Sequence, residues 1–270
     1  MHNELNKQVI GMVHVRALPG TPLAYYSVSK LISQAKDEAK LLYNSGFDAI
    51  MLENMHDLPY LNRYAGPEIT SSLTAIACSV KSAVPLPIGL QVLAGANKTA
   101  LAIALAAKLD FIRAEGFVYS QISDEGLISS DAGKLLRYRR NIGAEHIKIY
   151  CDIKKKHASH SLTSDISIKE TAKAAEFFLA DGVIITGKST GLPADNHEVK
   201  DVRETVNCPI FIGSGITAEN LAQYWNYADG FIVGSYLKFD GVWSNELSEK
   251  RCQKLIEKVE RLRNEEKRDG

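Results

Sequence analysis

Short apolar runs alternate with longer amphipathic segments along almost the whole chain, and this alternation limits the folds that the sequence can adopt. The runs are strand-sized and apolar on both faces, as in parallel strands that are covered on both sides. Eight strands are predicted, at residues 9–15, 48–54, 87–93, 111–117, 147–153, 182–187, 209–215 and 230–236.

The segments between these strands repeat apolar residues near the helical period, as at Leu31, Ala35 and Leu42. Helices are expected at residues 29–44, 68–82, 97–108, 131–142, 168–180, 217–225 and 245–264, with a shorter one at 195–205. Gly46 marks the end of the first helix and Thr217 the start of the seventh, and the last helix should fray after Leu262.

Eight strand-then-helix units in one chain predict a single (β/α)8 TIM barrel. The alternative is an open, doubly wound parallel sheet. The regular spacing, without a linker or a break in composition, favours the closed barrel. We expect one domain over residues 1–270, with its core at about 9–262.

Composition excludes several classes of protein. The 270 residues carry 32 basic and 32 acidic side chains, which argues against a nucleic-acid partner bound through bulk charge. The apolar runs are too short for a membrane span, and the N-terminus has no signal-like region. The four cysteines are far apart and predict free thiols in a reducing compartment, so we expect a cytoplasmic protein.

Polar side chains occupy the carboxyl ends of the predicted strands, where TIM barrels place their active sites. Strand alternation points one set of them into the barrel mouth: His14, Glu53, Gln91, Arg113, Glu115 and Asp152. Buried charges are costly unless they are paired. The set therefore indicates a site, although Arg113 with Glu115 or Asp152 could instead form an internal salt bridge.

Glycines end the seventh and eighth strands. Gly213, Ser214 and Gly215 follow one strand, and Gly234 and Ser235 follow the other. Barrels often bind phosphate between these two loops, because glycine lets backbone N–H groups approach an anion and a following helix adds its dipole. The hydroxyls of Ser214, Thr217 and Ser235 are further candidate donors. We expect a phosphorylated small-molecule ligand here.

The sixth strand leads into ITGKSTGLP, residues 185–193, with Thr186, Gly187, Lys188 and Gly191 as candidate ligand contacts. This segment could wrap a second anionic or sugar-like group, or it could be a mobile lid hinged at its glycines. The spacing of a P-loop is absent.

A basic loop, residues 151–160, follows the fifth strand. Lys156 could neutralise phosphate or form a Schiff base, and His157 could carry a proton. The alternative is a solvated basic loop. The sequence requires no cofactor, and a metal site built from His14, Glu53, Asp152 and His157 is a less favoured alternative.

Seven stretches in combination resemble the BtpA/SgcQ family: residues 11–22, 53–59, 124–144, 152–160, 181–191, 213–220 and 230–243. The resemblance covers about residues 9–262 and implies a phosphate-binding type of TIM barrel. Its founding member is tied to stable accumulation of photosystem I, and other members lie beside sugar-uptake genes. Gln91 and Glu115 stand where the family commonly has asparagines, which implies an altered site polarity.

Three functions follow as hypotheses. The first is an enzyme acting on a sugar phosphate or nucleotide-like ester by isomerisation, aldol-type cleavage or hydrolysis. Its acid–base candidates are His14, Glu53 and Asp152, and its charge stabilisers are Arg113 and Lys156. The second is a non-enzymatic assembly or stability factor, and the third is a sensor of a phosphorylated metabolite. A homo-oligomer is a further expectation.

Overall fold

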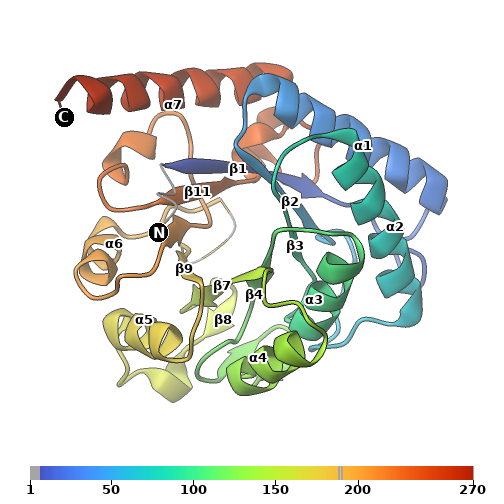
Figure 1. Ribbon diagram of the computed structural model, residues 1–270, viewed down its shortest axis with the longest axis horizontal. Helices are drawn as coiled ribbons and strands as arrows, with labels where there is room; N and C mark the ends of the chain where they lie inside the picture. Colours follow the sequence, from blue (N-terminus) through green and yellow to red (C-terminus); the bar gives the residue numbers. More distant parts are fainter. Residues whose placement is uncertain (1–6, 188, 190, 270) are drawn as a thin grey trace.

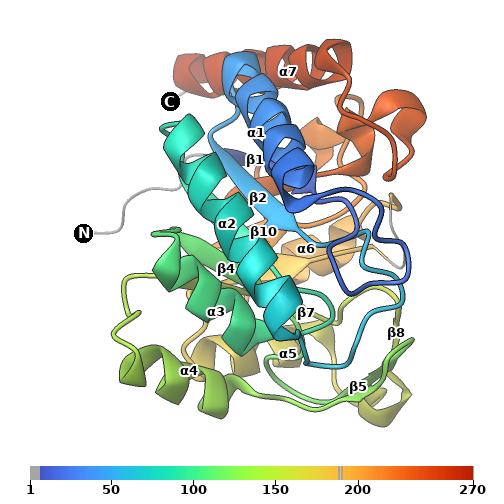
Figure 2. The same cartoon turned by 90° about the vertical axis from the view of Figure 1, so that its right-hand side faces the viewer.

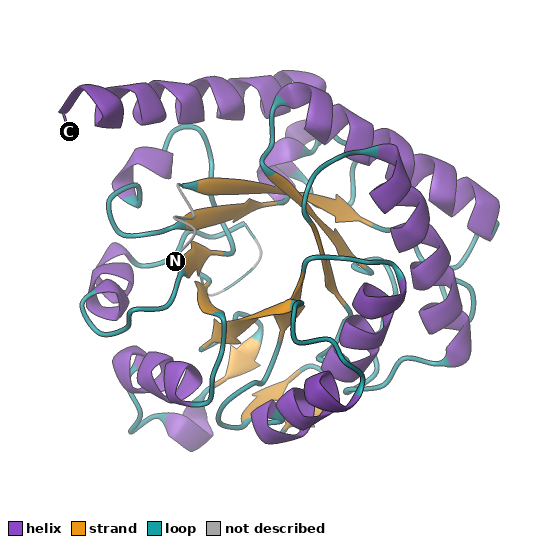
Figure 3. Cartoon of the chain, in the orientation of Figure 1, coloured by secondary structure: helices purple, strands orange, loops and turns teal. Residues whose placement is uncertain are grey.

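The computed structural model, which describes residues 7–187, 189 and 191–269, confirms the closed barrel (Figures 1 and 3). Its strands are β1 (Gln8–His14), β2 (Ala49–Glu53), β3 (Ile88–Gln91), β4 (Phe111–Ala114), β7 (Lys148–Ile153), β9 (Gly182–Ile185), β10 (Ile210–Ile212) and β11 (Gly230–Val233). All of them are parallel, and the ring closes where β1 pairs with β11.

Helices surround the ring on the outside (Figure 3). They are α1 (Val28–Ser45), α2 (Pro67–Ala83), α3 (Asn97–Ala106), α4 (Ala132–Asn141), α5 (Ile168–Phe177), α6 (Asn196–Arg203) and α7 (Glu249–Asp269). Ser27 caps the start of α1, and Gly46 ends it with a φ of 96° that favours glycine. Ser167 and Glu170 form a capping box at the start of α5. None of the helices in the described part of the chain is long and apolar enough to cross a membrane.

The prediction of a helix at residues 217–225 is wrong. The structure has only a 3₁₀ turn there, η2 (Leu221–Gln223). The Thr217 hydroxyl accepts from the backbone N–H groups of Glu219 and Asn220, as a helix start would. The Asn220 side chain, however, bonds the backbone of Thr217 and Gly215 at 2.8 and 2.7 Å. Such local bonds compete with an α-helix.

The expected fraying of the last helix after Leu262 is also wrong, because α7 continues to Asp269. Its final turns contact the base of the barrel. Arg263 donates to the carbonyl oxygen of Lys7 at 2.9 Å, and Trp225 donates to Glu266 at 3.3 Å. These contacts connect a charged and largely exposed segment to the barrel.

Two apolar layers stabilise the barrel. The larger lies between strands and helices, and the smaller fills the barrel interior. The interior residues are Ile10, Met12, Ala49, Met51, Phe111, Tyr150, Ile184, Phe211 and Ile232. The rings of Phe111, Tyr150 and Phe211 pack in series, with centroids 5.4 and 4.5 Å apart. This aromatic layer fills the lower part of the barrel, beneath the polar side chains of the mouth.

Three short strands that the sequence did not predict lie over the mouth: β5 (Gln121–Ser123), β6 (Gly126–Ile128) and β8 (Ala158–Ser159). They form a separate antiparallel sheet in the order β6-β5-β8. Two loops, one after β4 and one after β7, supply them. Figure 2 shows β5 and β8 on the right, on the same side as the loop between β1 and α1 and opposite the N-terminus.

Gly89 makes room for the interior aromatic layer, because a Cβ there would lie 2.0 Å from the Phe111 ring. We expect Gly89→Ala to lower the free energy of unfolding by about 1–3 kcal/mol through overpacking. Adding Phe111→Leu should recover part of that loss, since the two sites share one space. Urea unfolding of both single variants and the double variant measures the coupling; simple additivity would contradict this packing.

Candidate active site

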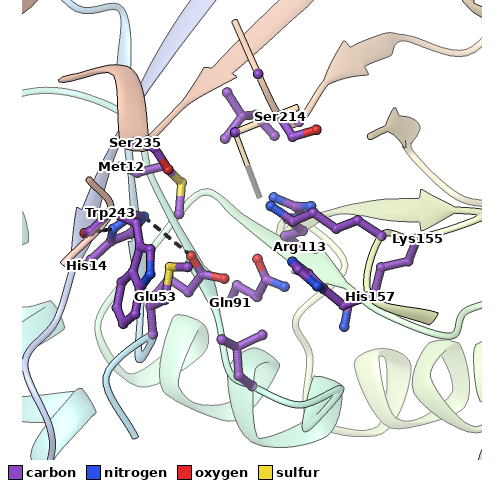
Figure 4. A pocket seen from close by; sticks show the side chains of 18 of the residues that line it. Met12, His14, Glu53, Gln91, Arg113, Lys155, His157, Ser214, Ser235 and Trp243 are labelled. Carbon is purple, nitrogen blue, oxygen red and sulfur yellow. Dashed lines mark hydrogen bonds and ion pairs between the residues drawn. The ribbon is translucent and has the colours of Figure 1, made fainter. Parts of the chain in front are cut away.

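A cavity of about 370 Å³ opens at the carboxyl ends of the barrel strands (Figure 4). Most of the predicted site residues line it: His14, Glu53, Gln91, Arg113, Glu115, Lys156, His157, Gly191, Gly213, Ser214, Gly215, Gly234 and Ser235. Asp152, Thr186 and Gly187 are not among the lining residues, and Lys188 lies outside the described residues. Residues that the sequence placed on separate strands and loops therefore share one cavity.

Strand register places three of these side chains side by side. His14 pairs with Glu53 across β1 and β2, and Glu53 pairs with Gln91 across β2 and β3. The same register sets Met12 beside Met51 one step lower, in the apolar interior. A polar layer therefore lies directly on the apolar layer, and the polar groups are largely shielded from bulk water.

His14 is buried and held in one orientation. Its Nδ1 lies 3.0 Å from the carbonyl oxygen of Trp243, which can only accept, so Nδ1 carries the proton. Burial, reinforced by the charge of Lys238, lowers the pKa of His14 to about 3. The imidazole is therefore neutral near pH 7, and Nε2 presents a lone pair 3.7 Å from Glu53 Oε2, as Figure 4 shows.

Glu53 is a second acid–base candidate whose pKa is shifted by its surroundings. Its side chain is buried, and desolvation raises the pKa of the carboxyl group even though the charges of Arg113 and Lys156 oppose the shift. A carboxyl group of this kind is suited to exchange protons closer to neutral pH than an exposed one.

Arg113 and Asp152 form a buried bidentate ion pair. Arg113 Nε and Nη2 donate to the two carboxylate oxygens of Asp152 at 2.9 and 2.7 Å. The internal salt bridge that the sequence left open is therefore confirmed for Asp152. The acid–base role expected of Asp152 has no support in this geometry, because both of its oxygens are occupied and it does not line the cavity. It positions Arg113 instead.

Glu115 contacts two neighbours through a single oxygen. Gln91 Nε2 lies 2.7 Å and Lys155 Nζ 2.9 Å from Glu115 Oε1. The sequence alone does not distinguish Lys155 from the other two lysines of its loop. Burial lowers the pKa of Lys155, but the adjacent Glu115 carboxylate outweighs it, so the net shift is upward.

Lys156 and His157 enter the cavity from the loop that leads into β8. The backbone N–H of Lys156 donates to the Thr186 hydroxyl at 3.0 Å, which fixes the loop. Burial, followed by repulsion from Arg113, lowers the pKa of Lys156, and burial also lowers the pKa of His157. The alternative of a solvated basic loop is therefore excluded for Lys156.

The metal site considered from the sequence is not assembled. Asp152 is engaged by Arg113, and within residues 7–187, 189 and 191–269 no three His, Cys, Asp or Glu side chains gather in a geometry that could hold a metal ion.

The glycine loops pack against each other more closely than the sequence suggested. A Cβ on Gly215, whose φ is 66°, would lie 2.3 Å from the backbone of Leu192, and a Cβ on Gly187 would meet the same segment. The Ser214 hydroxyl accepts from Gly187 N–H at 2.6 Å and donates to the Leu192 carbonyl at 3.1 Å. These glycines and this hydroxyl therefore join the loops after β9 and β10.

Backbone donors remain at the ends of β10 and β11. The N–H groups of Ser214, Gly215 and Ser235 donate to no acceptor among the described residues. The expected helix dipole behind them is absent, because only the 3₁₀ turns η2 and η3 (Ser235–Leu237) follow. Any anion here would depend on N–H groups and side-chain cations rather than on a helix.

Several lining residues were missed by sequence reasoning: Tyr60, Asp124, Glu125, Lys155, Trp243 and Arg251. The unusual length of the loop at residues 53–68 was the signal for Tyr60. Arg251, on the first turn of α7, stacks over Tyr236 at 4.6 Å and lies beside the loop of Ser235. No local pattern marks Trp243 or Arg251, since both reach the mouth only through the path of the chain after β11.

Solved structures with this fold carry names that involve phosphorylated compounds. Thiamine phosphate pyrophosphorylase from Pyrococcus furiosus aligns with a TM-score of 0.59 at 13% identity, over 96% of this chain and 97% of its own. (S)-3-O-geranylgeranylglyceryl phosphate synthase from Thermoplasma acidophilum, solved with its substrate sn-glycerol-1-phosphate, aligns with a TM-score of 0.61 at 15% identity, over 94% of this chain and 93% of its own. At these identities the similarity shows the fold alone.

Sequence relatives are closer. An uncharacterized mitochondrial protein of Caenorhabditis elegans is 46% identical over 266 residues, which are 97% of this chain and 96% of that protein. The photosystem I biogenesis protein BtpA of Synechocystis is 33% identical over 255 residues, 94% of this chain and 88% of its own. The family model described as the BtpA family matches residues 5–261, and this chain therefore belongs to the BtpA family.

Proposed function

We propose that the protein is an enzyme that performs acid–base chemistry on a phosphorylated small molecule. The observation that carries the proposal is the buried pair of His14 and Glu53, 3.7 Å apart, in a cavity that also contains the cations of Arg113 and Lys156. Burying these groups costs stability through desolvation, and clusters of buried titratable groups in a cavity are typical of functional sites.

Glu53 is the proposed general base or acid, and His14 assists it. With Nδ1 donating to Trp243, the imidazole offers Nε2 as a proton acceptor toward Glu53. Arg113 and Lys156 would stabilise negative charge that develops on a substrate oxygen. A base beside two cations suits proton removal next to a carbonyl group, which begins both isomerisation and aldol-type cleavage. Hydrolysis is the less favoured alternative.

The proposed phosphate position is the edge of the cavity formed by β10 and β11. The N–H groups of Ser214, Gly215 and Ser235 provide donors there, and Arg251 provides a cation within the same lining. Structures of the same fold whose names include phosphorylated substrates support this placement by analogy. A cavity of about 370 Å³ lies at the small end of the range for ligand sites, which favours a sugar phosphate over a nucleotide.

An assembly role is the second candidate, and one surface observation favours it. Phe177, Phe178 and Leu179 are exposed together at the end of α5, with 82%, 46% and 68% of their surfaces accessible. This patch lies away from the catalytic candidates, so both roles are compatible. For the compartment, four free cysteines suit a reducing cytosol, as proposed from the sequence.

The first test is ligand binding. Sugar phosphates and nucleotides, each beside its unphosphorylated counterpart, are screened by thermal shift, and the hits are assayed for turnover. A ligand at 100 times its Kd stabilises the folded state by about 2.7 kcal/mol, which is a shift of several degrees. If no phosphorylated compound shifts Tm, the proposal fails.

Lys156→Met tests the cationic end of the site. The substitution leaves the backbone hydrogen bond from Lys156 to the Thr186 hydroxyl in place, so the variant should fold normally. We expect turnover to fall about 100-fold or more, because a cation that stabilises developing charge is lost. Lys40→Met, at an exposed position of α1, is the matched control and should retain full activity. Equal activity of the two variants would exclude the assigned role of Lys156.

Glu53→Gln tests whether the carboxyl group is kept at a cost in stability. Burial raises the pKa of Glu53 in the folded state. The ionised carboxylate therefore destabilises the folded protein. This cost is absent below the unfolded-state pKa of about 4.3 and reaches its full size above the folded-state pKa. The variant should therefore gain Tm at pH 8, by about 2–4 °C per kcal/mol, and little at pH 4. Glu260→Gln, on the exposed face of α7, should show no such difference. Thermal melts at both pH values check this, and a gain of equal size at both would contradict it.

A further inference from the structure

Two buried oxygens in the cavity lack hydrogen-bond donors. Gln91 Oε1 and Glu115 Oε2 accept no hydrogen bond from any residue that the structure describes. Their side chains are almost fully buried, with 2% and 1% of the residue surfaces accessible, and both residues line the cavity. Buried acceptors without donors are costly, and in a native protein they call for an explanation.

The orientation of both groups follows from their partners. Gln91 must turn its amide nitrogen to Glu115 Oε1, because a carboxylate oxygen only accepts, and its own Oε1 consequently points elsewhere. Lys155 approaches the same Glu115 oxygen at 2.9 Å. The available donors thus converge on one carboxylate oxygen, and the other is left with none.

The surrounding structure fixes this pair of acceptors. Asn97 bonds the backbone of Glu115 twice, accepting from its N–H at 3.1 Å and donating to its carbonyl at 2.8 Å. Arg63 donates to the carbonyl of the next residue, Gly116, at 2.8 Å and to Asp131 at 2.7 Å. Gln91 itself belongs to barrel strand β3. Rigid support of this kind is typical of groups that bind a ligand.

Gln91 and Glu115 are hydrogen-bonded to each other, and each keeps one acceptor oxygen without a donor, so together they favour a ligand that carries hydrogen-bond donors. A phosphate or carboxylate group offers only acceptors and would be repelled by Glu115. In Figure 4, Gln91 lies between Glu53 and His157, away from Ser214 and Ser235, where the phosphate is proposed to bind. The acceptors therefore face the part of the ligand that is not the phosphate.

We propose that Gln91 and Glu115 recognise a pair of adjacent hydroxyl groups, so that the substrate is a sugar phosphate with a free vicinal diol. This inference rests on the proposed function and narrows its substrate class. It gives a specific role to Gln91 and Glu115, which strand alternation had placed in the barrel mouth. Each hydroxyl would donate to one of the unoccupied oxygens, which removes the cost of burying them.

The experiment compares ligands that differ only in one hydroxyl group. Ribose phosphate is measured against deoxyribose phosphate, and glucose phosphate against deoxyglucose phosphate, by calorimetry or thermal shift with the full chain. Adenosine and deoxyadenosine monophosphates form a third pair. For the sugar that binds, we expect the deoxy compound to bind about 10-fold more weakly or worse, because a buried acceptor is left unpaired.

Gln91→Leu should remove much of this discrimination. It deletes one acceptor while keeping a side chain of similar size, so the ratio of the two affinities should fall toward one. Gln34→Leu is the matched control, because Gln34 Oε1 is also a buried acceptor without a donor but lies on α1. That variant should keep the full ratio, whatever its effect on stability.

The outcomes separate the two proposals. If a sugar phosphate binds and its deoxy counterpart binds equally well, the diol inference is overturned while the proposed function stands. If only the nucleotides bind, and with no preference for ribose, the inference is again overturned. If no phosphorylated compound binds, the proposed function itself fails and the inference fails with it.

Discussion

The bidentate ion pair between Arg113 and Asp152 is the interaction on which the arrangement of the barrel mouth depends. It lets a guanidinium group remain buried directly above the aromatic layer, because both carboxylate oxygens are matched by N–H donors. The positive charge then acts on Glu53 and Lys156, whose pKa shifts both include a contribution from Arg113. A buried pair of this kind is weak evidence for stability but good evidence for a fixed electrostatic environment.

Around this pair the polar groups divide into regions of different chemistry. His14 and Glu53, the proposed acid–base pair, lie on β1 and β2, and Gln91 with Glu115 presents acceptors on the neighbouring wall. Backbone N–H donors lie across the cavity at the ends of β10 and β11. The N–H donors would bind the anionic end of a sugar phosphate, and the acceptors on the opposite wall would bind its hydroxyl groups. This separation defines the direction in which the ligand would lie across the cavity.

Sequence periodicity was sufficient to predict the barrel and the inward-facing residues of its strands. His14, Glu53, Gln91 and Arg113 follow from alternation, because one residue of register decides which face a side chain occupies. The small sheet of β5, β6 and β8 could not be predicted, since its strands are two or three residues long and are stabilised by partners from another loop.

The glycine pattern was only partly informative for a related reason. A glycine at the end of a strand indicates that another group lies close to the backbone. It does not indicate whether that group is a ligand or another part of the chain. At Gly215 and Gly187 the neighbour is the backbone around Leu192, and at Gly234 it is the His14 ring, whose Nε2 would lie 3.1 Å from a Cβ. The prediction of a helix after β10 is wrong because the Asn220 side chain forms hydrogen bonds with the backbone of Thr217 and Gly215. Helix propensities do not account for such bonds.

The hydrogen bond between His14 and Trp243 has a consequence for when the candidate site is assembled during synthesis. The two residues are 229 positions apart, and β1 completes the ring only by pairing with β11. Domains fold as units while the chain emerges N-terminus first, and contacts of long sequence separation form late. The proposed acid–base pair therefore gains its final orientation only after nearly the whole chain has left the ribosome, so a chain truncated before Trp243 would contain His14 without the contact that orients its ring.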